Sequence, residues 1–134
     1  FDTEEKLLLR PFSFYVKCFN LPSLFAGKMH ALLFRKWQTR VKGRDWYDME
    51  WYIRKGYKLN LNHLETRARD SGDWNEQPMS ETEFRNLLSE KIEAVDFKRV
   101  MEDIEPFLKD KTTISGWNKK YFQDLTAQLK ILTH

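Results

Sequence analysis

The chain has few residues that can cross-link it or interrupt its helices and strands. Among 134 residues there are one cysteine, Cys18, five glycines and four prolines. A single cysteine excludes an intramolecular disulfide and a zinc site built from cysteines, and it favours a reducing compartment. No apolar run is as long as a membrane span, and no signal-peptide pattern opens the sequence. We therefore expect a cytoplasmic protein with no membrane partner.

The composition is that of a globular domain. Hydrophobic residues make up 41% of the chain and charged residues 32%, and the aromatic share is 15%. This length suits one domain with a substantial core. The sequence begins at Phe1 without a methionine, and we interpret it as a piece of a longer protein.

The net charge of +3 hides an uneven distribution. Residues 28–58 carry nine Lys or Arg against three Asp or Glu, whereas residues 70–110 carry five against twelve. The basic segment suits a polyphosphate or a nucleic acid. Both segments would also be explained by ordinary solvated helix faces.

An N-terminal strand is predicted at about residues 12–19, where aromatic and β-branched residues dominate between two prolines. Residues 6–10 are a weaker candidate for a second strand. The remainder has the apolar periodicity and capping residues of about six helices. Their predicted ranges are 22–37, 44–55, 63–70 capped by Asn62, 81–94 opened by a Ser80/Glu83 capping box, 97–105 capped by Asp96, and 117–132. The predicted fold class is therefore mainly α with one or two N-terminal β-strands.

Lys28 lies one helical turn from Leu24 and from Leu32, at the border of an apolar stripe. Arg35 follows two turns later on nearly the same face. A lysine beside apolar side chains is partly desolvated, so its charge favours an anion such as phosphate. The alternative is a lysine whose stem packs while its ammonium stays in water.

Asp45 and Asp48 are three residues apart near the start of the second predicted helix, so they share a face that Tyr52 continues. The helix dipole stabilises carboxylates there. The two could bind Mg²⁺, orient a hydroxyl or pair with Lys28. The alternative is helix capping with an ion pair to Arg44 or Arg40.

Other catalytic patterns are lacking. His30, His63 and His134 are too scattered for a metal triad, and no Gly-rich phosphate loop or nucleophile elbow is present. We interpret His30 as a surface or packing residue. The acidic residues of the 71–78 loop region, Asp70, Asp73 and Glu76, do not match a calcium loop and are expected to be solvated.

Two segments together resemble the AbiEii/AbiGii toxin family, which are bacterial nucleotidyltransferase-like toxins of toxin–antitoxin and abortive-infection systems. Residues 21–35 read Leu-Pro-Ser-Leu-Phe-Ala-Gly-Lys-Met-His-Ala-Leu-Leu-Phe-Arg, and residues 40–48 read Arg-Val-Lys-Gly-Arg-Asp-Trp-Tyr-Asp. The family pattern is a strand, a helix with Lys-x-x-Ala-x-x-x-Arg and a helix opening with Arg-Asp-x-x-Asp. It falls on Lys28, Ala31, Arg35, Arg44, Asp45 and Asp48, within residues 12–52.

The resemblance implies that Lys28 contacts nucleotide phosphates, with Arg35 and Arg44 as further phosphate-binding candidates. It implies an active-site role for Asp45, or failing that Asp48. The family's Gly-Ser-type loop and Mg²⁺-binding acidic pair have no match in residues 1–27. We therefore expect residues 1–20 to end a nucleotidyltransferase sheet and residues 21–134 to form a helical C-terminal domain, inactive without its N-terminal domain, which would hold Mg²⁺.

Three functions remain open. The whole protein would transfer NMP from an NTP to an acceptor such as tRNA, as the resemblance implies. Alternatively, the helical part binds a cognate antitoxin or other partner without catalysis, or a basic surface at residues 35–58 binds RNA. Exposed rings at Trp74, Trp117 and Tyr121 would favour a separate protein partner, whereas exposed rings at Phe12, Phe14 and Trp37 would favour a missing domain.

Overall fold

The computed structural model describes residues 20–34 and 42–132, and within these ranges the fold is mainly α, as predicted. The helices are α2 (Leu21–Phe34), α3 (Gly43–Arg54), α4 (Leu61–Asp70), α5 (Glu81–Ala94), α6 (Phe97–Ile104) and α7 (Lys119–Thr126). The described residues also form two short strands, β1 (Lys58–Asn60) and β2 (Lys130–Leu132). They contain two 3-10 helices, η1 (Glu105–Phe107) and η2 (Lys111–Ile114). The predicted strands at 6–10 and 12–19 lie outside the described residues, as do Cys18, Arg35, Trp37 and Arg40.

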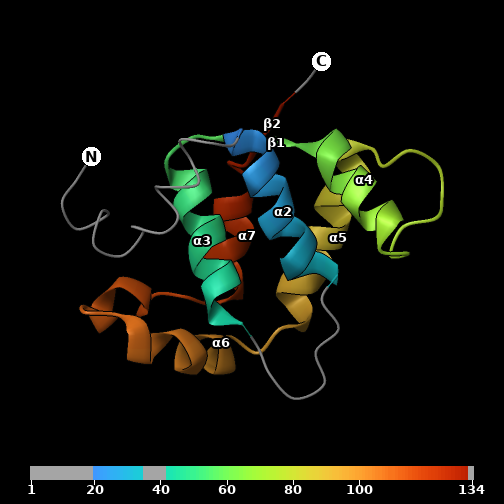
Figure 1. The fold of residues 1–134 in the computed structure, drawn as a ribbon. Coiled ribbons are helices and arrows are strands. Elements are labelled where there is room, and N and C mark those ends of the chain that lie inside the picture. Colours follow the sequence, from blue (N-terminus) through green and yellow to red (C-terminus); the bar gives the residue numbers. More distant parts are fainter. Residues whose placement is uncertain (1–19, 35–41, 133–134) are drawn as a thin grey trace.

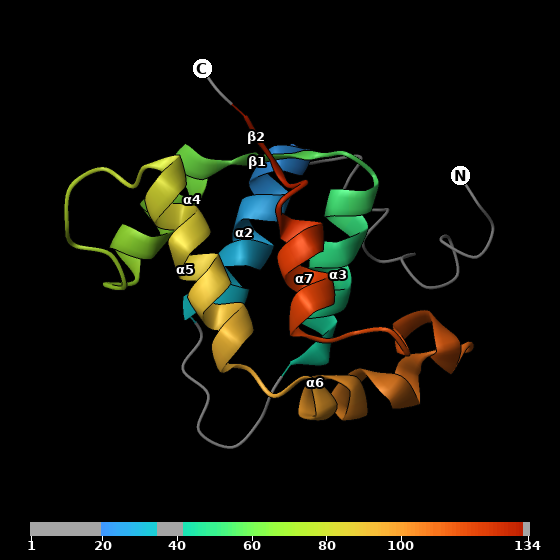
Figure 2. The ribbon, with the colours of Figure 1, turned by 180° about the vertical axis from the view of Figure 1, so that it is seen from behind.

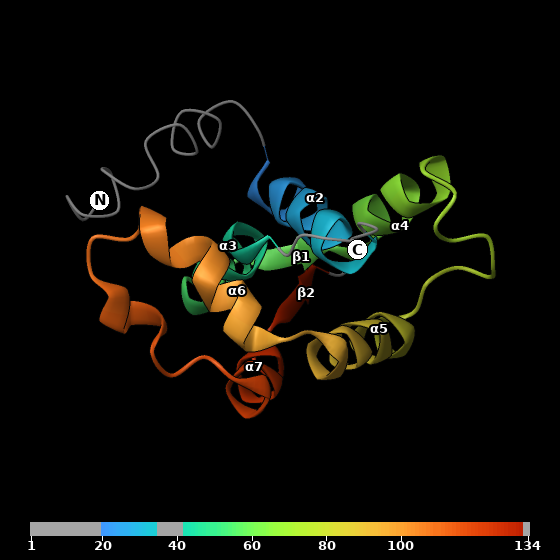
Figure 3. The same cartoon turned by 90° about the horizontal axis from the view of Figure 1, so that it is seen from below.

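The long helices form two layers (Figures 1 and 3). Helices α2 and α3 lie side by side in one layer, and α5 and α7 lie behind them in the other. Figure 2, from behind, shows α6 crossing beneath the lower end of α3, while β1 and β2 lie at the opposite end of the bundle. The beginning of α3 is therefore enclosed by neighbouring elements.

Aromatic rings fill the junction of α3, α6 and α7. Trp46 meets Phe97 and Phe122 edge-on, with ring centroids 5.1 Å and 5.2 Å away, and those two phenylalanines stack on each other at 5.0 Å. All three rings are buried. Such offset and edge-to-face pairs add to the stabilisation that their buried area supplies, so this cluster fixes where α6 crosses α3.

The two strands join distant parts of the chain as a parallel pair, with Leu59 opposite Ile131. The predicted final helix, 117–132, was therefore wrong at both ends. It begins only after Asn118, whose side chain accepts from the Tyr121 N–H at 2.7 Å. It ends at Thr126, where Arg85 of α5 donates to the carbonyls of Thr126 and Leu129, at 3.1 Å and 2.8 Å; carbonyls at a helix end have no partner within the helix.

The N-terminus of α4 also differs from the prediction. Asn60, not Asn62, caps this helix, and its Oδ1 accepts from the His63 N–H at 3.0 Å. Both asparagines suit a capping position. The end of β1 at Asn60 decides between them, since a cap requires extended backbone just before the first helical turn.

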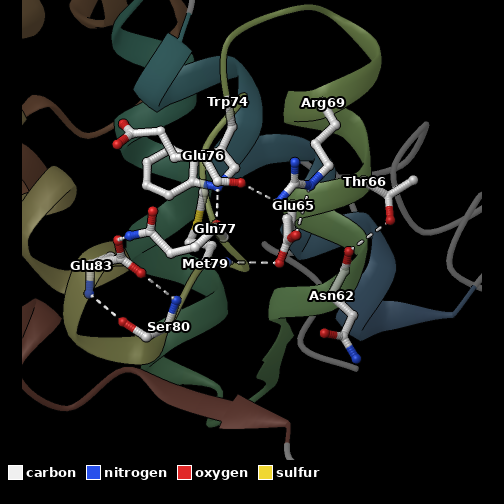
Figure 4. A network of polar contacts seen from close by, with 10 residues as sticks. All are labelled: Asn62, Glu65, Thr66, Arg69, Trp74, Glu76, Gln77, Met79, Ser80 and Glu83. Atoms are coloured by element: carbon white, nitrogen blue, oxygen red, sulfur yellow. Dashed lines mark hydrogen bonds and ion pairs between the residues drawn. The ribbon is translucent and has the colours of Figure 1, made fainter.

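The loop between α4 and α5 is held by a polar network (Figure 4). Glu65 accepts from the Met79 N–H at 2.9 Å and from Arg69 Nε at 2.8 Å, and Arg69 also donates to the Glu76 carbonyl. The predicted capping box is confirmed, with Ser80 and Glu83 each accepting from the other's backbone N–H. The chain thus enters α5 in a fixed direction.

Gly43 begins α3 in direct contact with α6. A Cβ built there would lie 2.4 Å from the Val100 carbonyl oxygen and 2.9 Å from the Ile104 Cβ. The Gly43 N–H, which has no partner within its own helix, donates to Asp103 Oδ2 at 2.8 Å. A side chain at position 43 would therefore push α3 and α6 apart.

No helix of the described ranges combines the length and apolar character needed to cross a membrane.

We expect Gly43→Ala to lower the free energy of unfolding by about 1–3 kcal/mol, the usual cost of forcing extra atoms into packed structure. Gly116→Ala is the matched control, because a Cβ there meets nothing within 4 Å and its φ is not positive. Urea unfolding followed by circular dichroism measures both. Equal midpoints for the two variants would contradict the close packing of α3 on α6.

Candidate functional site

Lys28 of α2 lies between the two aspartates of α3. Its Nζ is 2.9 Å from Asp48 Oδ2 and 3.3 Å from Asp45 Oδ1. The carboxylates are nearly covered, with side-chain exposures of 6% and 8%, whereas the lysine side chain keeps 29%. The spacing of three residues places both carboxylates on one face, as the sequence predicted, and that face points at α2.

The floor of this cluster is aromatic. Tyr52 continues the aspartate face of α3 one turn later and stacks on Phe25 of α2, with ring centroids 4.6 Å apart and an interplanar angle of 3°. Burial, and then the charge of Asp48, raise the pKa of the Tyr52 hydroxyl far above its usual value. The phenol therefore stays protonated at physiological pH and cannot act there as a base.

The arginines predicted for the site have different outcomes. Arg44 Nε lies 3.5 Å from Asp48 Oδ1, four residues along α3, and its side chain is 47% exposed. It borders the cluster and could reach an incoming ligand. Arg35 lies outside the described residues, so its part in the site stays a prediction.

The formal charges of Lys28, Arg44, Asp45 and Asp48 sum to zero. A lysine ammonium has three protons; Lys28 donates one to Asp45 Oδ1, and its Nζ also lies 2.9 Å from Asp48 Oδ2. A further acceptor would approach the exposed part of Lys28. The arrangement can thus offer the ammonium to an anionic oxygen.

The described residues do not by themselves fit a Mg²⁺ site. Within the ranges 20–34 and 42–132, no group of three or more His, Cys, Asp or Glu side chains converges as metal ligands. Asp45 and Asp48 already face an ammonium, which competes with a cation for the same oxygens. The alternative that these two aspartates alone bind the metal is not supported by this geometry.

A third buried carboxylate on α3, that of Glu50, was missed in the sequence. Glu50 Oε2 accepts from the Trp117 indole at 3.2 Å and from the Tyr121 hydroxyl, and it lies 3.6 Å from Arg54 Nη2. Burial, and then the hydrogen bond to Glu50, raise the pKa of Tyr121. Because Trp117 and Tyr121 lie 67 and 71 residues away in sequence, no local spacing could have indicated these two partners; only Arg54, four residues along, could have been found from spacing.

His30 does not form a hydrolase triad, although a serine and an aspartate lie beside it. His30 Nε2 lies 3.0 Å from Ser71 Oγ and 3.4 Å from Asp73 Oδ2, while Ser71 Oγ donates directly to Asp73 at 2.5 Å. In a triad the histidine separates the other two residues. The cluster ties the loop after α4 to α2, so the expectation of a solvated residue fails for Asp73, whose side chain is 19% exposed and paired, whereas Asp70 and Glu76 are exposed as expected.

The aromatic residues that would have favoured a separate partner are not exposed. Trp74 and Trp117 are 8% and 4% exposed, and Tyr121 is half-buried. Trp74 donates its indole N–H to the Gln77 carbonyl inside the α4–α5 loop. These rings pack within the fold, so they do not indicate a surface for a separate protein partner.

We expect Asp48→Ala to lower the free energy of unfolding by about 1–3 kcal/mol, since the partly buried Lys28 then loses its nearer acceptor. Asp124→Ala is the control, because it removes the same side chain from an exposed pair with Lys120, 68% and 86% exposed. That pair is expected to contribute no more than about 0.5 kcal/mol. Chemical denaturation at pH 7 compares the two, and equal losses would show that the Lys28 contacts do not stabilise the fold.

Comparison with known proteins gives one family assignment. No curated protein and no solved structure matches the chain. A family model described as nucleotidyl transferase AbiEii toxin, type IV toxin–antitoxin system, matches residues 3–127. The match extends well beyond residues 12–52, which carried the resemblance in the sequence, and confirms it. The chain belongs to the AbiEii nucleotidyltransferase toxin family.

Proposed function

We propose that this chain supplies the lysine side of a nucleotidyltransferase site, in a toxin that transfers NMP from an NTP to an acceptor such as tRNA. The supporting observation is Lys28, held within 3.3 Å of both Asp45 and Asp48 while 29% of its side chain remains exposed. These are residues of the Lys-x-x-Ala and Arg-Asp-x-x-Asp segments. Membership of the family supports the reaction class.

In this proposal Lys28 binds the phosphates of the NTP. Nucleotidyl transfer breaks the bond between the α- and β-phosphates as the acceptor hydroxyl attacks the α-phosphorus, and pyrophosphate leaves with added negative charge. A fixed ammonium stabilises that charge without reorganising. Arg44, beside Asp48, is placed to share it, and Arg35 is proposed for the same role.

Asp45 and Asp48 then act first by positioning Lys28. Their small exposures, 6% and 8%, leave little room for direct contact with substrate while Lys28 lies between them. A direct catalytic role for Asp45, or for Asp48, requires Lys28 to turn toward the phosphates and uncover a carboxylate. Lysine is flexible enough for this change.

Mg²⁺ is proposed as the cofactor, held mainly by residues of an N-terminal domain outside the described part of the chain. When bound, it neutralises phosphate charge. The described residues would contribute Lys28 and the α3 aspartates as one half of the site. This completion by an N-terminal domain is part of the proposal.

Binding of a cognate antitoxin is a second candidate function, and it is compatible with the toxin–antitoxin family. The specific observation is Phe107 in η1, 68% exposed and the large hydrophobic side chain that the described part of the chain leaves to solvent. Such a ring, next to Pro106, suits a protein contact.

We expect Lys28→Ala to weaken NTP binding to the full-length protein in the presence of Mg²⁺ by about 1–3 kcal/mol, the scale of a charge-assisted contact. Isothermal titration calorimetry measures it. Lys120→Ala is the control, since that lysine is 86% exposed on α7 and lies in no candidate site. Circular dichroism first confirms that both variants are folded, and an unchanged affinity for Lys28→Ala would overturn the proposed role.

A further inference from the structure

A cavity of about 240 Å³ lies beside Asp45, and most of the residues that line it were not candidates in the sequence analysis. Its polar lining comes from the starts of α3 and α6 and the end of α5: Lys42, Asp45, Lys91, Asp96 and Arg99. Trp46 forms part of the apolar wall. The cavity thus collects residues separated by more than 50 positions in the chain.

Three cations, Lys42, Lys91 and Arg99, and two carboxylates, Asp45 and Asp96, line the cavity, so its lining carries a formal excess of one positive charge. Asp45 is also paired with Lys28, whereas Asp96 accepts from the Lys98 N–H at 3.0 Å and keeps its negative charge. In the part of the chain that the structure describes, neither Lys91 nor Arg99 has an ion-pair partner for its side chain. Like charges on one cavity repel each other, and an anion between them would remove that cost.

One wall of the cavity is apolar. Trp46 is 2% exposed, and Leu32, Ala94 and Val95 complete the wall. Lys91 is half-buried and Arg99 is exposed, so a phosphate group can reach both cations from solvent. Lysine and arginine are both common phosphate ligands, the latter often through two hydrogen bonds.

Asp45 is shared between this cavity and the Lys28 cluster. It lines the cavity, and its Oδ1 lies 3.3 Å from Lys28 Nζ. Asp45 therefore borders both the Lys28 cluster and the cavity that Lys91 and Arg99 line. A nucleotidyl transfer to RNA brings two phosphate-bearing reactants together, and each needs its own cations.

We infer that this cavity is a second phosphate-binding site, in which Lys91 and Arg99 bind a phosphate group other than the one that Lys28 binds. The inference rests on the proposed nucleotidyl transfer. The phosphate belongs either to a phosphodiester of the acceptor RNA or to the NTP, which share the same chemistry. Either would be held next to Asp45.

The test uses the full-length protein and three probes: inorganic pyrophosphate, an NTP with Mg²⁺, and a fluorescently labelled single-stranded RNA. In the variant Lys91→Gln/Arg99→Gln we expect binding of pyrophosphate, and of at least one of the other probes, to weaken about tenfold or more, as loss of two charge-assisted contacts implies. The matched control, Lys98→Gln/Lys109→Gln, removes the same number of charges from exposed positions that do not line the cavity. It corrects for the general effect of net charge on RNA binding.

The outcomes separate the sources of the phosphate. Weakened RNA binding with unchanged NTP binding assigns the cavity to the acceptor, and the reverse assigns it to the donor. The inference is overturned if the cavity variant binds all three probes like the control variant, or if the unmodified protein binds none of them. If Lys28→Ala loses NTP binding while the cavity variant binds all three probes like the control variant, the proposed function stands and the cavity fails. If only the cavity variant loses binding while Lys28→Ala binds the NTP normally, the cavity stands and the proposed role of Lys28 fails.

A variant that keeps the charges, Lys91→Arg/Arg99→Lys, shows whether lost binding comes from misfolding and not from lost charge. It disturbs the same positions, and we expect it to retain binding within about threefold, since both side chains remain cations. A loss equal to that of the glutamine variant would contradict a site based on charge.

Discussion

The contact between Lys28 and the two aspartates of α3 is the constraint on which the site depends. Two nearly covered carboxylates would be costly to bury without a cation, because ionised groups lose their hydration there. Lys28 supplies that cation from α2. Helices α2 and α3 are thereby fixed in register with each other, while part of the lysine side chain stays exposed. In the proposed site, stability and ligand binding would use the same ammonium, so a ligand that draws Lys28 outward must compensate for what the aspartates lose.

The position of those aspartates depends in turn on how α3 begins. Gly43 lets the helix start against the backbone of α6, and Asp103 accepts its first free N–H. Trp46 then packs against Phe97 of α6 and Phe122 of α7. At the other end of the helix, Glu50 is held by Trp117 and Tyr121. Helix α3 is therefore anchored on both sides of the aspartates by elements that contribute nothing directly to the Lys28 cluster.

Much of this could be predicted where the cause is local. The capping box at Ser80 and Glu83, the Asp96 cap and the shared face of Asp45 and Asp48 follow from spacings of three residues or fewer. What could not be predicted depends on distant contacts: the partners of Glu50, the cavity that gathers Lys91 and Arg99, and the two strands of three residues each. The choice of Asn60 over Asn62 belongs here too, since the pairing of β1 with β2 sets where the helix starts. The strand predicted at residues 12–19 and the role predicted for Arg35 stay predictions, because these residues lie outside the described ranges.

The parallel pairing of β1 with β2 has a consequence for the order in which the fold is acquired. Residues 58–60 find their partner only at residues 130–132, so this contact closes a loop of about 70 residues. Helices α4, α5 and α6 can form locally during synthesis, whereas the pairing waits for the last of these residues to leave the ribosome. Leu59, which is fully buried in the finished fold, remains without its strand partner until then. The newly made chain therefore remains open to proteases and to aggregation at this contact until residues 130–132 have emerged.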